Sequence, residues 1–426
     1  MELKVTKISK RTLPTYFTIG LLTMALYYLS FRYPFQINST TTSPTYIDTP
    51  LILKALKYGL FIVWVYLYAL LFFMLRTYTQ SITKKDMLFL VASSIISIFP
   101  LVTFLISKEI FLFQTGLFFV ATIFYSLYQE KYINLSKLSK IVSFFILAAI
   151  VFEGYQLINY YVAGRLPALA YENSISVRFG SIWDDPNGFA LLIPLLLSFS
   201  MVKCKKLVNK IVLAAVFMFM LIFTQSLTGT ISTLASMLIG ITLIYLSTSS
   251  KKTFTKTVWL MASYLLGLVV FLKFILPLPT IQRFIYLKSG SIEGHLNIID
   301  LLKDASFMDL LGLNPYGMYG ESGYINLLLN FGVFYTLVYL IVGFCTVLVL
   351  LNKIKTYRGE KGVEIYYGAF FFAIAYMIAL SNLPVDTIFP LNLIYVICII
   401  IAMSKPLELE VVGIKSKKRF FPKITL

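Results

Sequence analysis

Residues 324–351 read YINLLLNFGVFYTLVYLIVGFCTVLVLL, an apolar run longer than the roughly 20 residues that one helix needs to cross a bilayer. Gly332 lies near its start, so a first turn along the membrane surface or a strong tilt would account for the excess length. Runs of helix length recur from one end of the chain to the other. They predict an all-α, polytopic membrane protein.

The composition also indicates that lipid is the main solvent. Of the 426 residues, 58% are hydrophobic and 13% are charged, whereas soluble domains carry roughly 25% charged residues. We expect one integral membrane domain, residues 1–426, with about twelve transmembrane helices. Their approximate ranges are 13–31, 51–75, 87–106, 110–128, 141–162, 187–202, 211–226, 230–248, 257–276, 324–351, 364–383 and 388–404.

The net charge of +18 is distributed unevenly. Most of the 37 lysines and arginines fall in the two tails and in the loops of one side, as the positive-inside rule requires of the cytoplasmic face. Both termini are therefore expected in the cytoplasm, and the basic excess indicates topology, not a nucleic-acid partner. The chain has no P-loop, HExxH or dinucleotide motif, and its three cysteines and one histidine show no metal-ligand spacing. We predict no metal and no cofactor.

Two extended loops are expected on the outer side besides residues 32–50. Residues 163–186, AGRLPALAYENSISVRFGSIWDDP, carry Arg178 and lead into the sixth span. Residues 277–323 precede the tenth span without any membrane-length apolar run, and we expect them to cover the active site.

Arg178 and the sequence Asp185-Pro186-Asn187 mark the outer end of the sixth span. Proline suits the first turn of a helix, because its missing N–H would be unpaired there. An arginine near membrane depth is costly unless it is paired or lines a wet cavity, and its planar guanidinium suits phosphate. The alternative is that Arg178 pairs with Asp184 or Asp185 and only holds the loop.

The loop 277–323 holds further candidates. His295, the single histidine, follows Glu293 and is either a group that titrates near neutrality or a structural residue. Four glycines in residues 312–323 predict unusual backbone angles or the close approach of a partner. Glu321 lies at the outer end of the tenth span and is either a reactive carboxylate or a helix cap.

Three features closer to the spans complete the set. Residues 224–230, TQSLTGT, separate the seventh and eighth spans, and a short outer turn explains them fully. Glu153 and Lys273 are ionisable groups inside or near spans, which makes them functional candidates by default. Lys273 is close enough to the outer end to extend its ammonium group to the interface.

The order of these motifs resembles the O-antigen ligase and polysaccharide polymerase family, which includes the Wzy-type polymerases of O-antigen, capsule and exopolysaccharide. The resemblance covers roughly residues 140–350. It rests on Arg178-x-Gly180 with Asp185-Pro-Asn187, the Thr224-Gln-Ser-x-Thr-Gly hairpin, Gly312-x-Asn-Pro-x-Gly, and Glu321-Ser-x-Tyr324. It implies a GT-C-like glycosyltransferase architecture in the cytoplasmic membrane of a bacterium, with an active site that faces outside.

The ligase branch of this family typically shows His-Asn before its last conserved span and a second arginine in the long loop. This chain has Glu321-Ser322 at the first position, and the second falls nearest His295. These departures favour the polymerase branch. A ligase, or a flippase or other transporter of lipid-linked oligosaccharides, is the alternative. Transporters often break their helices near the midplane, whereas this chain is expected to place its polar residues at the outer membrane face.

The resemblance implies two lipid-linked substrates and no metal or nucleotide. The donor is an undecaprenyl-diphosphate-linked glycan, the acceptor is an undecaprenyl-diphosphate-linked oligosaccharide repeat unit, and further partners are the bilayer and a chain-length regulator. Direct displacement predicts inversion at the anomeric carbon. The residues expected to bind the diphosphate are Arg178, Arg283, Arg165 and Lys288. The base is Glu321 or His295, with Glu293 orienting His295, and the supporting residues are Asp185, Asn187 and Tyr324.

Overall fold

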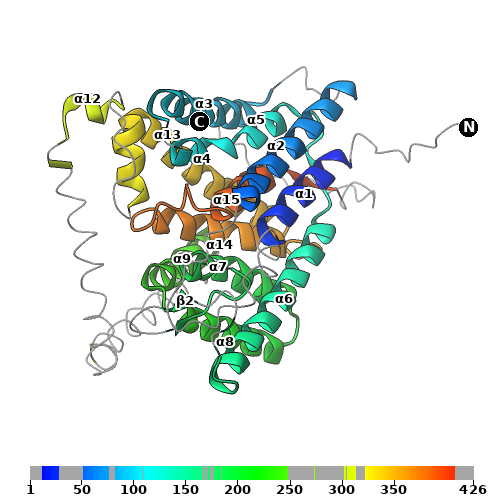
Figure 1. Cartoon of the computed structure of the whole chain (residues 1–426). Coiled ribbons are helices and arrows are strands. Elements are labelled where there is room, and N and C mark those ends of the chain that lie inside the picture. The colour runs from blue at the N-terminus through cyan, green and yellow to red at the C-terminus, as the bar shows by residue number, and fades with distance from the viewer. Residues whose placement is uncertain are drawn as a thin grey trace, which may run out of the picture.

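The computed structural model describes residues 12–27, 51–75, 82–108, 110–165, 167, 171–172, 177–183, 185–247, 273, 302–303, 305–312 and 322–407. Within them the protein is a bundle of helices, as expected (Figure 1). Six of the described helices are long and apolar enough to cross a membrane. They are α3 (Lys84–Ser107), α6 (Leu135–Tyr161), α7 (Pro186–Lys203), α8 (Leu207–Thr224), α9 (Leu227–Ser247) and α13 (Gly323–Thr356).

The described structure also contains seven further helices and four two-residue strands. The helices are α1 (Leu13–Tyr27), α2 (Leu51–Met74), α4 (Ile110–Leu117), α5 (Val120–Leu127), α12 (Phe307–Leu310), α14 (Glu364–Ala379) and α15 (Leu391–Met403). Strand β1 (Tyr132–Ile133) pairs in parallel with β4 (Lys405–Pro406), and β2 (Tyr171–Glu172) pairs antiparallel with β3 (Val177–Arg178).

Helices occupy the expected ranges with two notable differences, apart from 257–276, of which the structure describes only Lys273. The range 110–128 contains two helices, because α4 ends at Leu117 and α5 begins at Val120. The long tenth range is divided at Gly332, whose φ of 82° and ψ of 173° are not helical. A backbone break thus accompanies the excess length for which we had expected a surface turn or a tilt.

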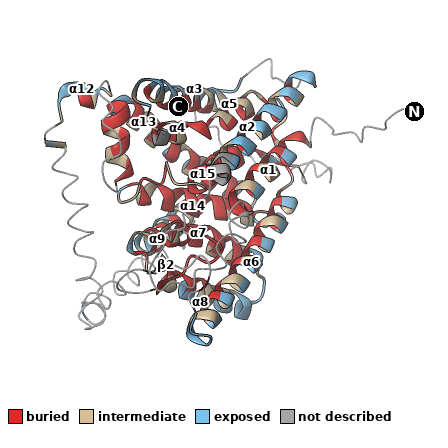
Figure 2. Cartoon of the chain, viewed as in Figure 1, coloured by how far each residue is buried: buried red, intermediate tan, exposed pale blue. Residues whose placement is uncertain are grey.

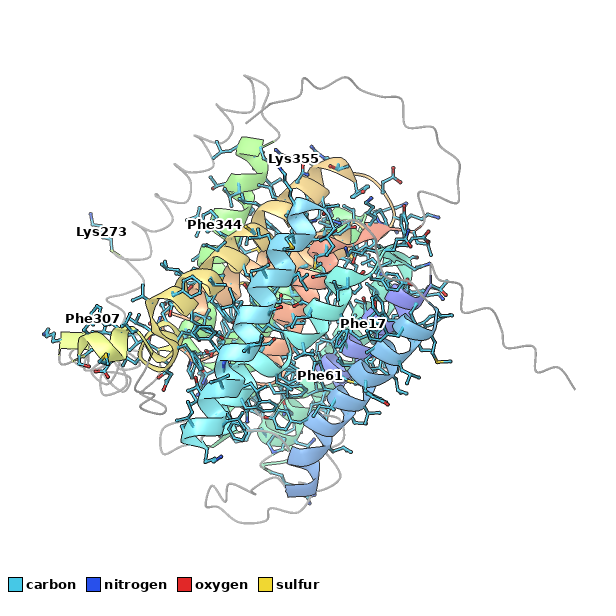
Figure 3. All side chains as sticks on the ribbon, turned by 90° about the horizontal axis from the view of Figure 1, so that it is seen from above. Phe17, Phe61, Lys273, Phe307, Phe344 and Lys355 are labelled. Atoms are coloured by element: carbon cyan, nitrogen blue, oxygen red, sulfur yellow. The ribbon has the colours of Figure 1, made fainter. Side chains whose placement is uncertain are left out.

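The most buried helices are short ones. α14 lies at the centre of the bundle, with α13 and α15 on one side and α7 and α9 on the other (Figures 1 and 2). Every residue of α15 is buried. Peripheral helices instead expose apolar side chains, such as Ile222 on α8 and Phe344 on α13, which points away from the bundle (Figure 3). Such apolar exteriors suit a lipid environment.

Helices α7 and α14 run antiparallel. The hydroxyl of Ser198 on α7 donates to the carbonyl of Tyr367 on α14 at 3.4 Å. The start of α7 and the end of α14 therefore lie at one end of the bundle, and the opposite termini lie at the other. We call these the Arg178 end, which includes residues 177–186 and 380–390, and the lysine end, which includes residues 129–134 and 353–363.

Candidate functional site

Arg178 is buried at the end of β3, with 7% of its surface exposed. Its Nε donates to the carbonyl of Thr224 at 2.8 Å, and its Nη2 donates to Oδ1 of Asn187 at 2.7 Å. Thr224 is the last residue of α8, and Asn187 lies in the first turn of α7. The guanidinium group therefore joins the loop to the ends of two helices.

Asp185 caps the start of α7, and Pro186 is the first helical residue, as predicted. The Asp185 carboxylate accepts a hydrogen bond from the backbone N–H of Asn187 at 2.9 Å. Burial raises the pKa of Asp185, whereas that N–H, the N–H of Gly188 and the charge of Arg178 oppose the shift. The charge of Arg178 thus acts on Asp185, in addition to the hydrogen bonds that its guanidinium group donates to Asn187 and Thr224.

The turn at residues 225–226 also supports Arg178, a role that we had not expected of it. Gln225 adopts a left-handed conformation, with a φ of 48°, and its Nε2 donates to the carbonyl of Val177 at 3.2 Å. The backbone N–H of Phe179 donates to the carbonyl of Phe223 at 3.0 Å. The residues on both sides of Arg178 are therefore tied to the end of α8.

Glu153 is a buried carboxylate on α6, with 3% of its surface exposed. It lies beside the backbone of Ser181, whose φ of 55° is unusual for a residue with a side chain. One turn earlier on α6, the carbonyl of Ala149 accepts from the Ser181 hydroxyl at 2.8 Å. The loop that follows Arg178 is therefore folded against an ionisable group of a long apolar helix.

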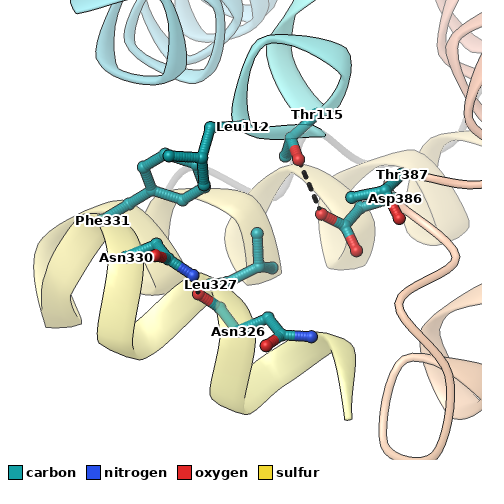
Figure 4. A pocket seen from close by; sticks show the side chains of 8 residues that line it. All are labelled: Leu112, Thr115, Asn326, Leu327, Asn330, Phe331, Asp386 and Thr387. Carbon is teal, nitrogen blue, oxygen red and sulfur yellow. Dashed lines mark hydrogen bonds between the residues drawn. The ribbon is translucent and has the colours of Figure 1, made fainter. Parts of the chain in front are cut away.

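A second polar site at the Arg178 end is built around Asp386 (Figure 4). The residue lies between α14 and α15, is 2% exposed, and accepts from the hydroxyl of Thr115 at 3.0 Å. Its other carboxylate oxygen, Oδ1, is buried without a hydrogen-bond partner among the described residues. Asn326 and Asn330 from α13 line the same pocket.

Asp386 is an unusual carboxyl group. Burial raises its pKa from 3.8 to about 6, although the hydrogen bond from Thr115 opposes the shift. Three fully buried tyrosines, Tyr335, Tyr339 and Tyr376, lie within electrostatic range of it. Our sequence interpretation missed Asp386, although it is the sole acidic residue between Glu364 and Lys405 and stands between two prolines.

The end of the predicted cover loop is anchored beside this pocket. Gly312 and Gly332 both have positive φ, 76° and 82°. A Cβ on Gly312 would lie 2.4 Å from the backbone carbon of Phe331, and one on Gly332 would lie 2.6 Å from that of Leu311. The glycines at these two positions therefore permit direct backbone contact within the chain, and the unusual backbone angle expected at Gly312 is confirmed.

The remaining predicted site residues are placed only in part. Arg165 is exposed, and Tyr324 joins α13 to α14, because its hydroxyl donates to the carbonyl of Met377 at 2.6 Å. Lys273 is exposed, at a distance from the bundle in Figure 3. Outside the described residues lie Asp184, Arg283, Lys288, Glu293, His295 and Glu321.

Neither protein-family models nor curated protein sequences match this chain. In the part of the chain that the structure describes, no group of three or more His, Cys, Asp and Glu side chains is placed to hold a metal ion. The described site therefore consists of Arg178 with its neighbours Asp185, Asn187 and Thr224, and of the Asp386 pocket. Both lie at one end of a helical membrane bundle.

Proposed function

We propose that the protein is a polysaccharide polymerase of the bacterial cytoplasmic membrane. It transfers a growing undecaprenyl-diphosphate-linked glycan onto a lipid-linked repeat unit at the outer face and releases undecaprenyl diphosphate. In this proposal the chain crosses the membrane twelve times, both termini are cytoplasmic, and residues 277–323 cover the active site.

The observation that carries the proposal is the presence of two buried polar groups at one end of an apolar bundle. Arg178 is 7% exposed and Asp386 is 2% exposed. Both lie at the Arg178 end, because α7 begins where α14 ends. Buried ionisable groups are costly in a membrane protein and usually serve a function.

The reaction needs both kinds of group. A hydroxyl of the acceptor sugar attacks the anomeric carbon, the bond from that carbon to the diphosphate oxygen breaks, and the hydroxyl proton passes to a base. Arg178 stabilises the charge that develops on the departing diphosphate, helped by Arg283, Arg165 or Lys288. Glu321 or His295 accepts the proton, and Asp386 is a further candidate because its raised pKa makes it a stronger base than an ordinary carboxylate.

A transporter of lipid-linked oligosaccharides is the second candidate, and the interrupted helices favour it. The break at Gly332 and the separation of α4 from α5 are features of helices that line transport sites. A ligase would use the same donor chemistry with a different acceptor.

In vitro turnover distinguishes these functions. The purified protein in lipid vesicles is supplied with undecaprenyl-diphosphate repeat units alone. We expect a ladder of longer lipid-linked glycans without ATP. Movement of the repeat unit between leaflets without any ladder would instead identify a transporter, and extension only when a non-isoprenoid acceptor is added would identify a ligase.

A further inference from the structure

The lysine end of the bundle gathers positive charge from four separate segments. Lys85 comes from the start of α3, Lys131 from the connection before β1, Lys353 from the last turn of α13 and Lys405 from β4. Asp86 is the acidic residue that acts electrostatically on these lysines. The pairing of β1 with β4 holds the segments of Lys131 and Lys405 together.

Two of these lysines have partners in the protein. The Nζ of Lys131 forms a 2.8 Å ion pair with Asp86, whose carboxylate also accepts from the Thr83 hydroxyl at 2.8 Å. The Nζ of Lys85 donates to the carbonyl of Ala402 at 2.9 Å, at the negative end of the α15 dipole. The Asp86 carboxylate is thus paired with Lys131, and among the described residues it attracts Lys85 and Lys353 without forming an ion pair with either.

Lys353 is different. It is 8% exposed, and among the described residues no hydrogen-bond or ion-pair partner reaches its Nζ. Its Nζ lies 5.2 Å from the centroid of the Tyr366 ring, and the Asp86 carboxylate attracts it without an ion pair. Lys85 and Lys405 are close enough to repel its charge. A buried ammonium group with like charges around it is strongly unfavourable unless an anion compensates it.

We infer that Lys353, with Lys85 and Lys405, forms a binding site for a phosphate group at the lysine end. Lysine binds phosphate as a point charge with three N–H donors, and its charge-assisted hydrogen bonds are strong. Lys405 is exposed, so this side of the site is accessible from that end of the bundle.

The phosphate can belong to an anionic lipid headgroup or to a soluble phosphate compound. Basic pockets between helices at the cytoplasmic face suit headgroups. The outward face of α13, with Phe344 and Leu348, is apolar and exposed, but Lys353 lies on its buried face. The lysine ammonium groups account for the binding of a phosphate group. The experiment below distinguishes a lipid headgroup from a soluble phosphate compound.

Lys353→Met tests the site, with Lys355→Met as the matched control, because Lys355 is exposed on the same last turn of α13 (Figure 3). The full chain is placed in phosphatidylcholine vesicles alone, with added phosphatidylglycerol, or with inorganic phosphate. The thermal midpoint of unfolding and the binding of each anion are then measured.

In phosphatidylcholine alone we expect Lys353→Met to be more stable than the wild type, since it removes an uncompensated buried charge. At least one anion should raise the midpoint of the wild type and of Lys355→Met, and Lys353→Met should bind that anion at least tenfold more weakly. A response to phosphatidylglycerol alone identifies a lipid headgroup, and a response to both anions identifies soluble phosphate chemistry. No response, or an equal one in Lys353→Met, overturns the inference and leaves the proposed polymerase function untouched.

Discussion

The two ends of the bundle hold their ionisable groups in different ways. At the Arg178 end, Arg178 donates to an amide and a backbone carbonyl, and Asp386 accepts from one hydroxyl. At the lysine end, lysines from several segments cluster, and a salt bridge joins Lys131 to Asp86. Neutral groups hydrogen-bond to Arg178 and Asp386, whereas lysines from several segments gather at the lysine end.

This difference separates topology from function. The positive-inside rule accounts for many lysines at one end of a membrane protein. It does not account for the burial of Arg178 and Asp386 at the opposite end. We therefore expect Arg178 and Asp386, and not the lysines at the lysine end, to take part in the reaction. Substitutions at the Arg178 end should lower activity, whereas substitutions of exposed basic residues at the lysine end should not.

The largest effect is expected from Arg178→Ala. Loss of the guanidinium should lower polymer formation by about 10²–10³-fold, since one donor to a developing negative charge contributes that much in other enzymes. Glycan ladders in the purified system measure this. Arg358→Ala, an exposed arginine at the lysine end, serves as the control and should keep wild-type activity. Equal losses in both variants, or full activity of Arg178→Ala, would contradict the proposed role.

Asp386→Asn should lower activity and raise stability. The Asp386 pKa is higher in the folded protein, about 6, than its ordinary 3.8, so the free energy of unfolding of the wild type falls as pH rises from about 4 to 6. Above pH 6 the full cost is present, up to about 3 kcal/mol. The variant should lack this decrease and unfold later at pH 7. Unfolding of both proteins in detergent at several pH values measures this difference in stability. Parallel curves of the unfolding free energy against pH would refute the prediction.

Gly332→Ala tests the contact between residues 311–312 and α13. Alanine must adopt a positive φ and also meets the Leu311 backbone, so we expect a loss of about 1–2 kcal/mol beyond backbone strain alone. Gly359→Ala supplies the strain alone, since Gly359 has a φ of 88° with open space around it. Thermal unfolding compares the two variants, and equal losses would show that the contact contributes nothing.

Thr115→Val should have the smallest effect. It removes the hydroxyl that donates to Asp386 while keeping the shape of the side chain. Because that hydrogen bond lowers the Asp386 pKa, its loss should raise the pKa by up to about one unit, equivalent to about 1.4 kcal/mol. If Asp386 is the base, the acid limb of the pH–activity profile shifts to higher pH by up to about one unit. An unmoved limb would argue for Glu321 or His295 as the base.

Sequence alone determined the features that depend on local properties. Apolar length and charge placement identified the helices and the membrane class, because burial in lipid requires about 20 apolar residues whatever the neighbouring helices are. The helix start at Pro186 follows from neighbouring residues and was predicted, whereas the capping role of Asp185 was not. Gly332 stood out in the long run, although its backbone break was not foreseen.

Tertiary structure alone decided which groups meet. Thr115 and Asp386 are 271 residues apart, and Arg178 lies 46 residues from Thr224. No local periodicity predicts such contacts, because they depend on which helices pack together and at what height. The same reason explains the unforeseen role of the turn at Gln225 and the importance of Asp386. Hydropathy determines that a segment becomes a helix in lipid, but packing between distant helices determines which of its polar groups form a site.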